Sequence, residues 1–221
     1  MHPSAHGQLA SIVAPPRCAA CAATCGSGSV LCGECEAELA AARRVCEPGP
    51  PGVDLAVAVS EFEGVARRIV HGLKYARRLS LARVAAAAML AALPEGERVA
   101  GTRAGHKPDD GFLAVVPVPA GPWRWRWRGF DPAEELSIAI AKRAGIPLSA
   151  CLRRSTGRRQ VGRRRSERLS DPPRVWAVGA PASALLVDDV WTTGATLSAC
   201  AGALRGAGCD RVVALTLARA R

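Results

Sequence analysis

Aromatic residues and long apolar stretches are scarce in this chain of 221 residues. Phe, Trp and Tyr together make up 4% of it. The longest apolar run, residues 84–93, is mostly alanine and has about half of the length that a bilayer requires. The first residues also lack the apolar core of a secretory signal peptide. We therefore expect no membrane insertion and a soluble, cytoplasmic protein in which alanine-rich helices pack on a sheet.

Acidic residues are few relative to basic ones. The chain has 19 Asp and Glu against 30 Lys and Arg, which gives a formal net charge of +11 at pH 7. Nearly all of this excess lies in two arginine-rich segments, residues 124–128 and 153–168. Concentrated basic segments indicate an anionic partner, and both nucleic acid and a pyrophosphorylated substrate fit. A Walker phosphate loop is absent, because the one similar stretch, residues 157–164, lacks its Lys and its Ser or Thr.

A different anion-binding pattern lies near the end of the chain. The apolar residues 184–187 predict a buried parallel strand that ends on Asp188 and Asp189. A small, hydroxyl-rich loop, residues 192–196, then leads into a predicted helix at 197–205. The unpaired N–H groups of the first helical turn can bind a phosphate, while the two acids suit sugar hydroxyls or a metal ion. The pattern predicts a phosphosugar site; the simpler alternative is that these side chains only cap the helix.

The cysteines form a second pattern. The chain has 9 of them, and in a cytosolic protein this number argues for metal binding rather than disulfides. Two Cys-x-x-Cys pairs, Cys18 with Cys21 and Cys32 with Cys35, have the spacing of a tetrahedral zinc site. Cys25 could replace one of the first pair as a ligand. A redox pair or core cysteines are the alternatives to zinc.

Strand and helix patterns alternate through the remainder of the chain. Predicted strands lie at residues 54–60, 112–118, 184–187 and 211–217, and predicted helices lie at 63–78, 81–93, 132–144 and 197–205. This alternation predicts an α/β fold with a mostly parallel sheet flanked by helices, and ligands at the carboxyl ends of the strands. We expect residues 1–17 to be disordered, 18–46 to form a zinc-ribbon-like unit, and 47–53 to be a linker.

The loop after Asp189 resembles the phosphoribosyl pyrophosphate loop of type I phosphoribosyltransferases, and residues 17–219 as a whole resemble the ComF family. The ordered motifs that carry the resemblance are the four paired cysteines, Leu73-Lys74-Tyr75, Val116-Pro117-Val118-Pro119, Arg128-Gly129-Phe130, Gln160, Glu167-Arg168 and the loop 185–197. The resemblance implies a phosphoribosyltransferase-like domain over 53–221 behind an N-terminal zinc ribbon. It also implies a link to DNA uptake in natural transformation.

Several positions depart from the family pattern. Asp171 replaces the usual Asn, Arg163 the usual Leu, and Asp131-Pro132 the usual Asn-Gln. Many members carry a further Cys-x-x-Cys, of which only Cys46 remains here, so no second zinc is expected. These differences concern substrate contacts rather than the fold.

The resemblance also implies site residues. Those expected to be catalytic are Asp188, Asp189, Lys74 and Arg128, and those expected to bind phosphoribosyl pyrophosphate are Asp188, Asp189, Thr192, Thr193, Gly194, Ala195, Thr196, Arg124, Gln160 and Arg168. Transfer from this donor leaves positive charge on the ribose and releases pyrophosphate, so the protein must position the sugar and stabilise the leaving group. Mg²⁺ held largely by substrate oxygens would neutralise the pyrophosphate. The basic segment 153–168 is expected to close over the substrate; its alternative is a solvated linker.

Two function classes remain at this point. The first is a phosphoribosyltransferase, a glycosyltransferase that uses a phosphoribosyl donor and an unknown acceptor. The second is a non-catalytic module that handles single-stranded DNA, for which Trp123, Trp125 and Trp127 would form a stacking platform between arginines. Packing of these rings on the sheet is the alternative that we favour. The two acids and the threonine-rich loop favour the enzyme, since a DNA phosphate backbone needs neither.

Overall fold

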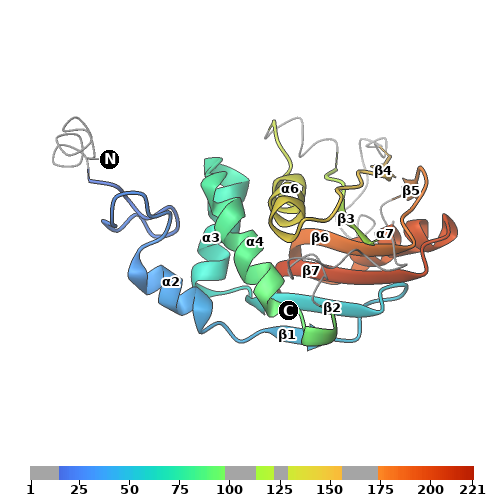
Figure 1. Ribbon diagram of the computed structural model, residues 1–221, viewed down its shortest axis with the longest axis horizontal. Coiled ribbons are helices and arrows are strands. Elements are labelled where there is room, and N and C mark those ends of the chain that lie inside the picture. The colour runs from blue at the N-terminus through green and yellow to red at the C-terminus, as the bar shows by residue number, and fades with distance from the viewer. Residues whose placement is uncertain (1–14, 98–112, 122–128, 156–173) are drawn as a thin grey trace, which may run out of the picture.

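The computed structural model describes residues 15–97, 113–121, 129–155 and 174–221. Its elements in chain order are α2 (Gly33–Ala40), β1 (Val45–Glu47), β2 (Leu55–Glu61), α3 (Gly64–Ala76), α4 (Ser80–Ala92), the short 3-10 helix η1 (Glu95–Glu97), β3 (Leu113–Pro117), α6 (Pro132–Ala144), β4 (Leu152–Arg154), β5 (Val175–Ala177), β6 (Ser183–Trp191), α7 (Ala195–Gly206) and β7 (Arg211–Arg219) (Figure 1). Among the described residues, no helix is long and apolar enough to cross a bilayer.

The main sheet confirms the expected α/β fold with mostly parallel strands. Its strand order is β1-β2-β7-β6-β3, in which β2, β7, β6 and β3 are parallel and β1 is antiparallel at one edge. A separate antiparallel pair, β4 and β5, lies beside it. The predicted alternation of strands and helices is the physical source of this arrangement, because parallel neighbours need a crossover between them.

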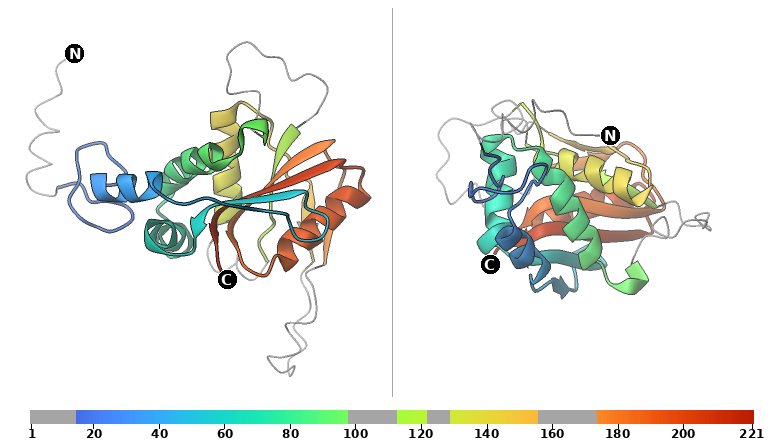
Figure 2. Two further views of the ribbon diagram at one scale, coloured as in Figure 1. Left: turned by 90° about the horizontal axis from the view of Figure 1, so that it is seen from below. Right: turned by 60° about the vertical axis from the view of Figure 1, so that its left-hand side comes forward.

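Helices cover both faces of the sheet. Helices α3, α4 and α6 lie on one face, and α7 lies on the other (Figure 2). Successive strand residues point to opposite faces, so Leu185 and Val187 of β6 join the core beneath α3, α4 and α6, while Ala184 and Leu186 join the core beneath α7. This explains why the strand is apolar without alternation.

Strand β6 is longer than the sequence predicts. The apolar run suggested an end at Val187, but pairing with β7 continues from Asp188 opposite Thr216 to Trp191 opposite Arg219. The neighbour on the other side, β3, ends at Pro117 opposite Val187. Asp188 and Asp189 therefore lie within β6 but beyond the end of β3. Polar side chains are tolerated at this point because β3 no longer flanks the strand.

The N-terminal cysteine segment packs on the main body. Cys18 and Cys35 share one core with Val65 and Ile69 of α3. Strand β1 continues this connection, since Val45–Glu47 pairs with β2. The segment that precedes β2, expected as a linker, contacts α7 through the Pro51 carbonyl, which accepts a hydrogen bond from the Ser198 hydroxyl (2.8 Å).

Candidate functional site

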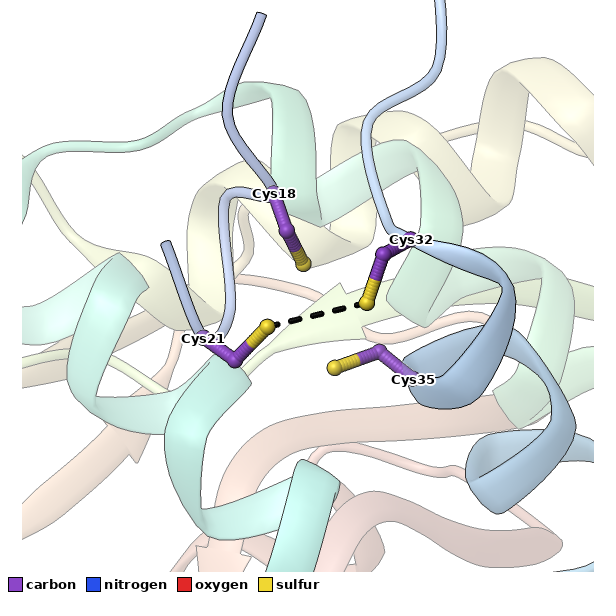
Figure 3. Close-up of side chains that lie close together, drawn as sticks. All are labelled: Cys18, Cys21, Cys32 and Cys35. Carbon is purple, nitrogen blue, oxygen red and sulfur yellow. Dashed lines mark hydrogen bonds between the residues drawn. The ribbon is translucent and has the colours of Figure 1, made fainter. Parts of the chain in front are cut away.

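The first candidate site is the cluster of paired cysteines. The Sγ atoms of Cys18, Cys21, Cys32 and Cys35 all lie within 4.8 Å of one another, and the four thiols point toward a common centre (Figure 3). The sulfurs of Cys21 and Cys32 are 3.6 Å apart. Tetrahedral zinc with Zn–S bonds of about 2.3 Å requires sulfurs about 3.8 Å apart. The four cysteines can therefore hold a structural zinc ion.

Local backbone structure presents these thiols. The first pair lies on a tight turn in which the Cys18 N–H donates to the Ala23 carbonyl (2.7 Å) and the Ala22 N–H donates to the Cys18 carbonyl (2.9 Å). In the second pair, Cys32 is the N-cap of α2 and Cys35 lies in its first turn. Both positions lie at the N-terminus of α2, where the partial positive charge of the helix suits the negative charge of a metal-bound thiolate.

The thiols of Cys18 and Cys35 differ in how readily they ionise. Burial raises the pKa of the Cys18 thiol, but hydrogen bonds from the backbone of Cys21 and Cys32 outweigh burial and lower this pKa to about 6. Burial raises the pKa of the Cys35 thiol to about 12, and the sulfurs of Cys21 and Cys32 add to the effect. Zinc binding to such a set would displace protons, because the ion binds thiolates.

Cys25 stands outside the four-sulfur cluster. Its thiol donates to the Ser29 carbonyl at 3.7 Å, and burial raises its pKa. Within the described part of the chain, the four paired cysteines are the one group of three or more His, Cys, Asp and Glu side chains that could hold a metal ion. The alternative in which Cys25 replaces a member of the first pair is therefore not adopted.

The surroundings of the cluster also fit a metal thiolate. Arg68 of α3 points its Nη2 at the Cys35 sulfur at 3.9 Å. Its Nε is buried and has no partner among the described residues. Thiolates bound to a metal are better N–H acceptors than neutral thiols, so a guanidinium with an unused donor suits this position.

The second candidate site is a cavity at the carboxyl ends of β3 and β6. It is lined by residues from α3, the segment after β3, α6, β4, β6 and α7: Lys74, Val118, Pro119, Ala120, Phe130, Asp131, Pro132, Ala133, Arg154, Asp188, Asp189 and Thr196. The structure thus brings Lys74 of α3 to the two acids of β6, although more than a hundred residues separate them in the sequence. Ligands in parallel sheets bind at this edge.

The two acids of this cavity have different environments. The Asp189 carboxylate forms an ion pair with the Lys74 ammonium at 2.7 Å, and the two side chains are 9% and 19% exposed. Asp188 lies nearer to α7, where its charge adds to the effect of burial and raises the pKa of the Cys200 thiol to about 12. Burial raises the pKa of Asp188 well above its usual range, and repulsion from Asp189 raises it further. A bound cation or hydroxyl donor would therefore stabilise the ionised form of Asp188.

The loop between β6 and α7 requires glycine at one position. Gly194 is the N-cap of α7 and has φ of +83°. A Cβ atom there would lie 2.9 Å from Cβ of Pro50 and 3.1 Å from Nε1 of Trp191. Among the described side chains, the Thr193 hydroxyl accepts a long bond (3.4 Å) from the Ala195 N–H, and the cap residue itself offers none. The first turn of α7 therefore keeps N–H groups available for an anion.

Arg219 supports this loop from β7. Its Nη1 donates to the carbonyls of Trp191 (3.2 Å) and Thr192, and its guanidinium lies 4.1 Å from the centre of the Trp191 ring. These contacts hold the backbone carbonyls at the start of the loop in place.

Asp131 is a cavity residue that the sequence-based site prediction omitted. Its carboxylate accepts from the Ala120 N–H (2.8 Å) and from the Ala133 N–H (3.0 Å), so it is the N-cap of α6 and also fixes the segment after β3. Burial raises its pKa, although these two hydrogen bonds act in the opposite direction. Asp followed by Pro before an apolar helix is a strong cap signal, and it could have identified this position.

Arg154 was predicted only as part of the basic segment 153–168. It lies in β4 and lines the cavity. The pairing of β4 with β5 continues through a hydrogen bond from the Ser155 N–H to the Arg174 carbonyl (3.0 Å). Ser155 and Arg174, the described residues on either side of positions 156–173, are therefore neighbours, and Arg154 is the one residue of this pair of strands that lines the cavity.

The predicted site residues fall into three groups. Lys74, Asp188, Asp189 and Thr196 line one cavity. Thr192, Thr193, Gly194 and Ala195 form the adjoining loop and the start of α7. The remaining predicted residues, together with the tryptophans and two of the departures from the family pattern, lie outside the described residues: Arg124, Arg128, Gln160, Arg168, Trp123, Trp125, Trp127, Arg163 and Asp171.

Lysine is rare enough in this chain to be a signal. Lys74, Lys107 and Lys142 are its lysines, and every other basic residue apart from histidine is arginine. Lys74 brings a compact point charge to the acids of the cavity, whereas arginine would bring a planar fork.

No protein-family model matches this chain, and no curated protein matches it significantly.

Proposed function

We propose that this protein is a ComF-like member of the phosphoribosyltransferase class that binds phosphoribosyl pyrophosphate with Mg²⁺ and carries a structural zinc. The observation that carries the proposal is the cavity in which the Lys74–Asp189 ion pair and Asp188 adjoin the glycine-containing loop at the start of α7. The acceptor is not specified by these residues. A link to DNA uptake follows from the resemblance.

Each part of the cavity has a role in the proposed reaction. The N–H groups at the start of α7 bind the phosphate on the ribose, because the helix end is positive and uncapped. Asp188 accepts hydrogen bonds from the ribose hydroxyls, with Asp189 held beside it by Lys74. Both carboxylates also favour the positive charge that develops on the sugar as the bond to pyrophosphate breaks.

Two cationic side chains of the cavity suit the leaving group. Arg154 of β4 and Lys74 of α3 both line it, and cations stabilise a departing pyrophosphate. Mg²⁺ would supply further neutralisation when it is bound with the substrate, and the carboxylates of Asp188 and Asp189 would be its protein ligands in this cavity. The raised pKa of Asp188 is consistent with a site that is completed by a cation.

The alternative of a single-stranded DNA module receives less support. Asp131, Asp188 and Asp189 all line the cavity, and three carboxylates would repel a phosphodiester backbone. The tryptophans that favoured this alternative lie outside the described residues. The enzyme class is therefore our conclusion.

Titration calorimetry with phosphoribosyl pyrophosphate and Mg²⁺ tests the proposal without the acceptor. The double variant Asp188→Asn with Asp189→Asn should weaken binding at least tenfold, because each lost charge-assisted hydrogen bond costs roughly 1.5–3 kcal/mol. Asp210→Asn is the matched control, since Asp210 is exposed just before β7 begins, at the end of the strands opposite the cavity. Its affinity should equal that of wild type.

The same samples distinguish the DNA alternative. If folded, zinc-loaded wild type shows no affinity for phosphoribosyl pyrophosphate but binds single-stranded DNA with a steep salt dependence, the proposal is wrong. In that case the double variant should bind DNA as well as wild type or slightly better, because two negative charges have been removed.

A further inference from the structure

Helix α3 connects the two candidate sites. Near its start, the Val65 N–H donates to Oε1 of Glu38 from α2 (2.7 Å). One turn later, Arg68 forms an ion pair with the same Glu38 and also contacts the Cys35 sulfur. Its last turn carries Lys74, which reaches Asp189 in the cavity. Helix α3, which is shown next to α2 in Figure 1, therefore contacts the cysteine cluster through Arg68 and the acid cavity through Lys74.

The far end of α3 is also held by the cysteine segment. Just after the helix, Arg78 donates from Nη1 to the Ala19 carbonyl, which lies on the turn of the first cysteine pair (2.6 Å). A Cβ atom on Gly72 would lie 3.5 Å from the same carbonyl and 2.5 Å from Leu81 of α4. The backbone of α3 thus packs closely between the first cysteine turn and α4, which leaves little room for an independent shift.

We propose that metal binding by the four cysteines positions Lys74, with Arg68 and Glu38 as the positioning residues. Zinc with four thiolates carries a net charge of −2, which holds the Arg68 guanidinium beside Cys35. Arg68 in turn holds Glu38, which fixes the first turn of α3. Because a helix moves as a unit, its orientation at Arg68 determines where Lys74 meets Asp189. The effect on ligand affinity rests on the proposed function, whereas the effect on Lys74 does not.

Lysine acetylation measures the position of Lys74 directly. Acetic anhydride labels exposed lysines, and mass spectrometry gives the rate at Lys74 relative to Lys142, which is exposed on α6. Removal of zinc by a chelator should raise this ratio about fivefold, since the ion pair that shields the Lys74 ammonium loosens. A moderate factor is expected because Arg68 and Glu38 are 38% and 44% exposed. An unchanged ratio in zinc-free protein with a native circular dichroism spectrum would overturn the proposal.

Variants in zinc-loaded protein separate positioning from general unfolding. Arg68→Gln should raise the Lys74 labelling ratio although zinc content and helicity stay at wild-type values. Arg68→Lys should restore the ratio in part, because it keeps the charge beside Cys35. Arg83→Gln is the matched control on α4, where Arg83 is exposed, and it should leave the ratio unchanged. A wild-type ratio for Arg68→Gln at full zinc occupancy would contradict the positioning role, even if the chelated protein unfolds.

Calorimetry with phosphoribosyl pyrophosphate on the same samples keeps the two proposals apart. Zinc-dependent labelling of Lys74 without any sugar-phosphate binding supports the positioning role and contradicts the proposed function. Equal affinity and equal labelling in wild type and Arg68→Gln support the proposed function and contradict the positioning role. Weaker affinity together with faster labelling in Arg68→Gln supports both.

Discussion

The two candidate sites are built in opposite ways. All four ligands of the cysteine cluster come from one short segment, residues 18–35, on a turn and on the first turn of a helix. The acid cavity draws its lining from six separate segments, and its central ion pair joins Lys74 of α3 to Asp189 of β6. The cysteine cluster is thus specified by local spacing, whereas the cavity exists only after the sheet has formed. Variants in each site should differ accordingly.

The largest effect is expected in the cysteine cluster. Cys32→Ser should abolish stoichiometric zinc binding, since structural zinc contributes apparent binding free energies of about 10–16 kcal/mol that are also folding free energy. Because Cys32 and Cys35 belong to the core that contains α3, the melting temperature of the whole chain should fall by more than about 10 °C. Elemental analysis and thermal melting check both results.

Cys46→Ser is the control for this variant. Cys46 is exposed in β1 and lies outside the four-sulfur cluster. Its replacement should leave zinc content and melting temperature unchanged. Full zinc occupancy in Cys32→Ser would show that the four cysteines are not the ligand set.

A smaller effect is expected from breaking the ion pair of the cavity. Lys74→Met and Asp189→Asn each leave one charge nearly buried without its partner, which should lower the free energy of unfolding by about 2–4 kcal/mol. The double variant should lose less than the two single variants together, because no unpaired charge remains. Urea unfolding of all four proteins measures the coupling.

The exposed ion pair of Arg221 and Glu47 is the comparison for this set of single and double variants. Its atoms are 2.8 Å apart, but the side chains are 65% and 38% exposed. Glu47→Gln should therefore change the free energy of unfolding by less than about 1 kcal/mol. Strictly additive losses at Lys74 and Asp189 would mean that their contact contributes nothing.

The smallest effect has the opposite sign. Burial raises the pKa of Asp188, so the folded protein retains a proton that the unfolded chain releases near its ordinary pKa of about 3.9. Stability is therefore lost as pH rises from there through the raised pKa, and the ionised carboxylate destabilises the ligand-free protein above it. Asp188→Asn should raise the melting temperature at pH 7 by about 2–4 °C, for a gain of about 1 kcal/mol.

A pH series of melting curves tests the origin of this gain. The advantage of Asp188→Asn over wild type should shrink as pH falls and be least well below the ordinary pKa of about 3.9, where Asp188 is protonated in both folded and unfolded protein. The asparagine keeps the oxygen that accepts the Asp189 N–H (2.8 Å), so the backbone contact is retained. A gain that grows at low pH would contradict the assignment of the raised pKa to Asp188.

Elements with strong local signals were predicted closely. The helix predicted at 132–144 is found as α6 with the same bounds, because Asp131 caps it, Pro132 opens it and Gly145 ends it with φ of +68°. The strand predicted at 184–187 is found as a longer β6, because pairing with β7 carries the strand through Asp188 to the apolar residues Val190 and Trp191. The hydrophobic pattern of a sequence indicates which residues are buried. It does not indicate that a polar residue such as Asp188 continues a strand through backbone pairing.

What the sequence determined by itself was local: the cysteine spacing, the cap signals of α6 and the order of strands and helices. These features depend on residues close together in the chain, where geometry follows from spacing. The tertiary structure alone decided that Lys74 pairs with Asp189 and not with its partner Asp188, that Asp131 and Arg154 join the same cavity, and that Arg68 of α3 meets Cys35. Each of these contacts joins segments whose approach depends on how helices pack on a twisted sheet, and no spacing within one segment encodes that distance.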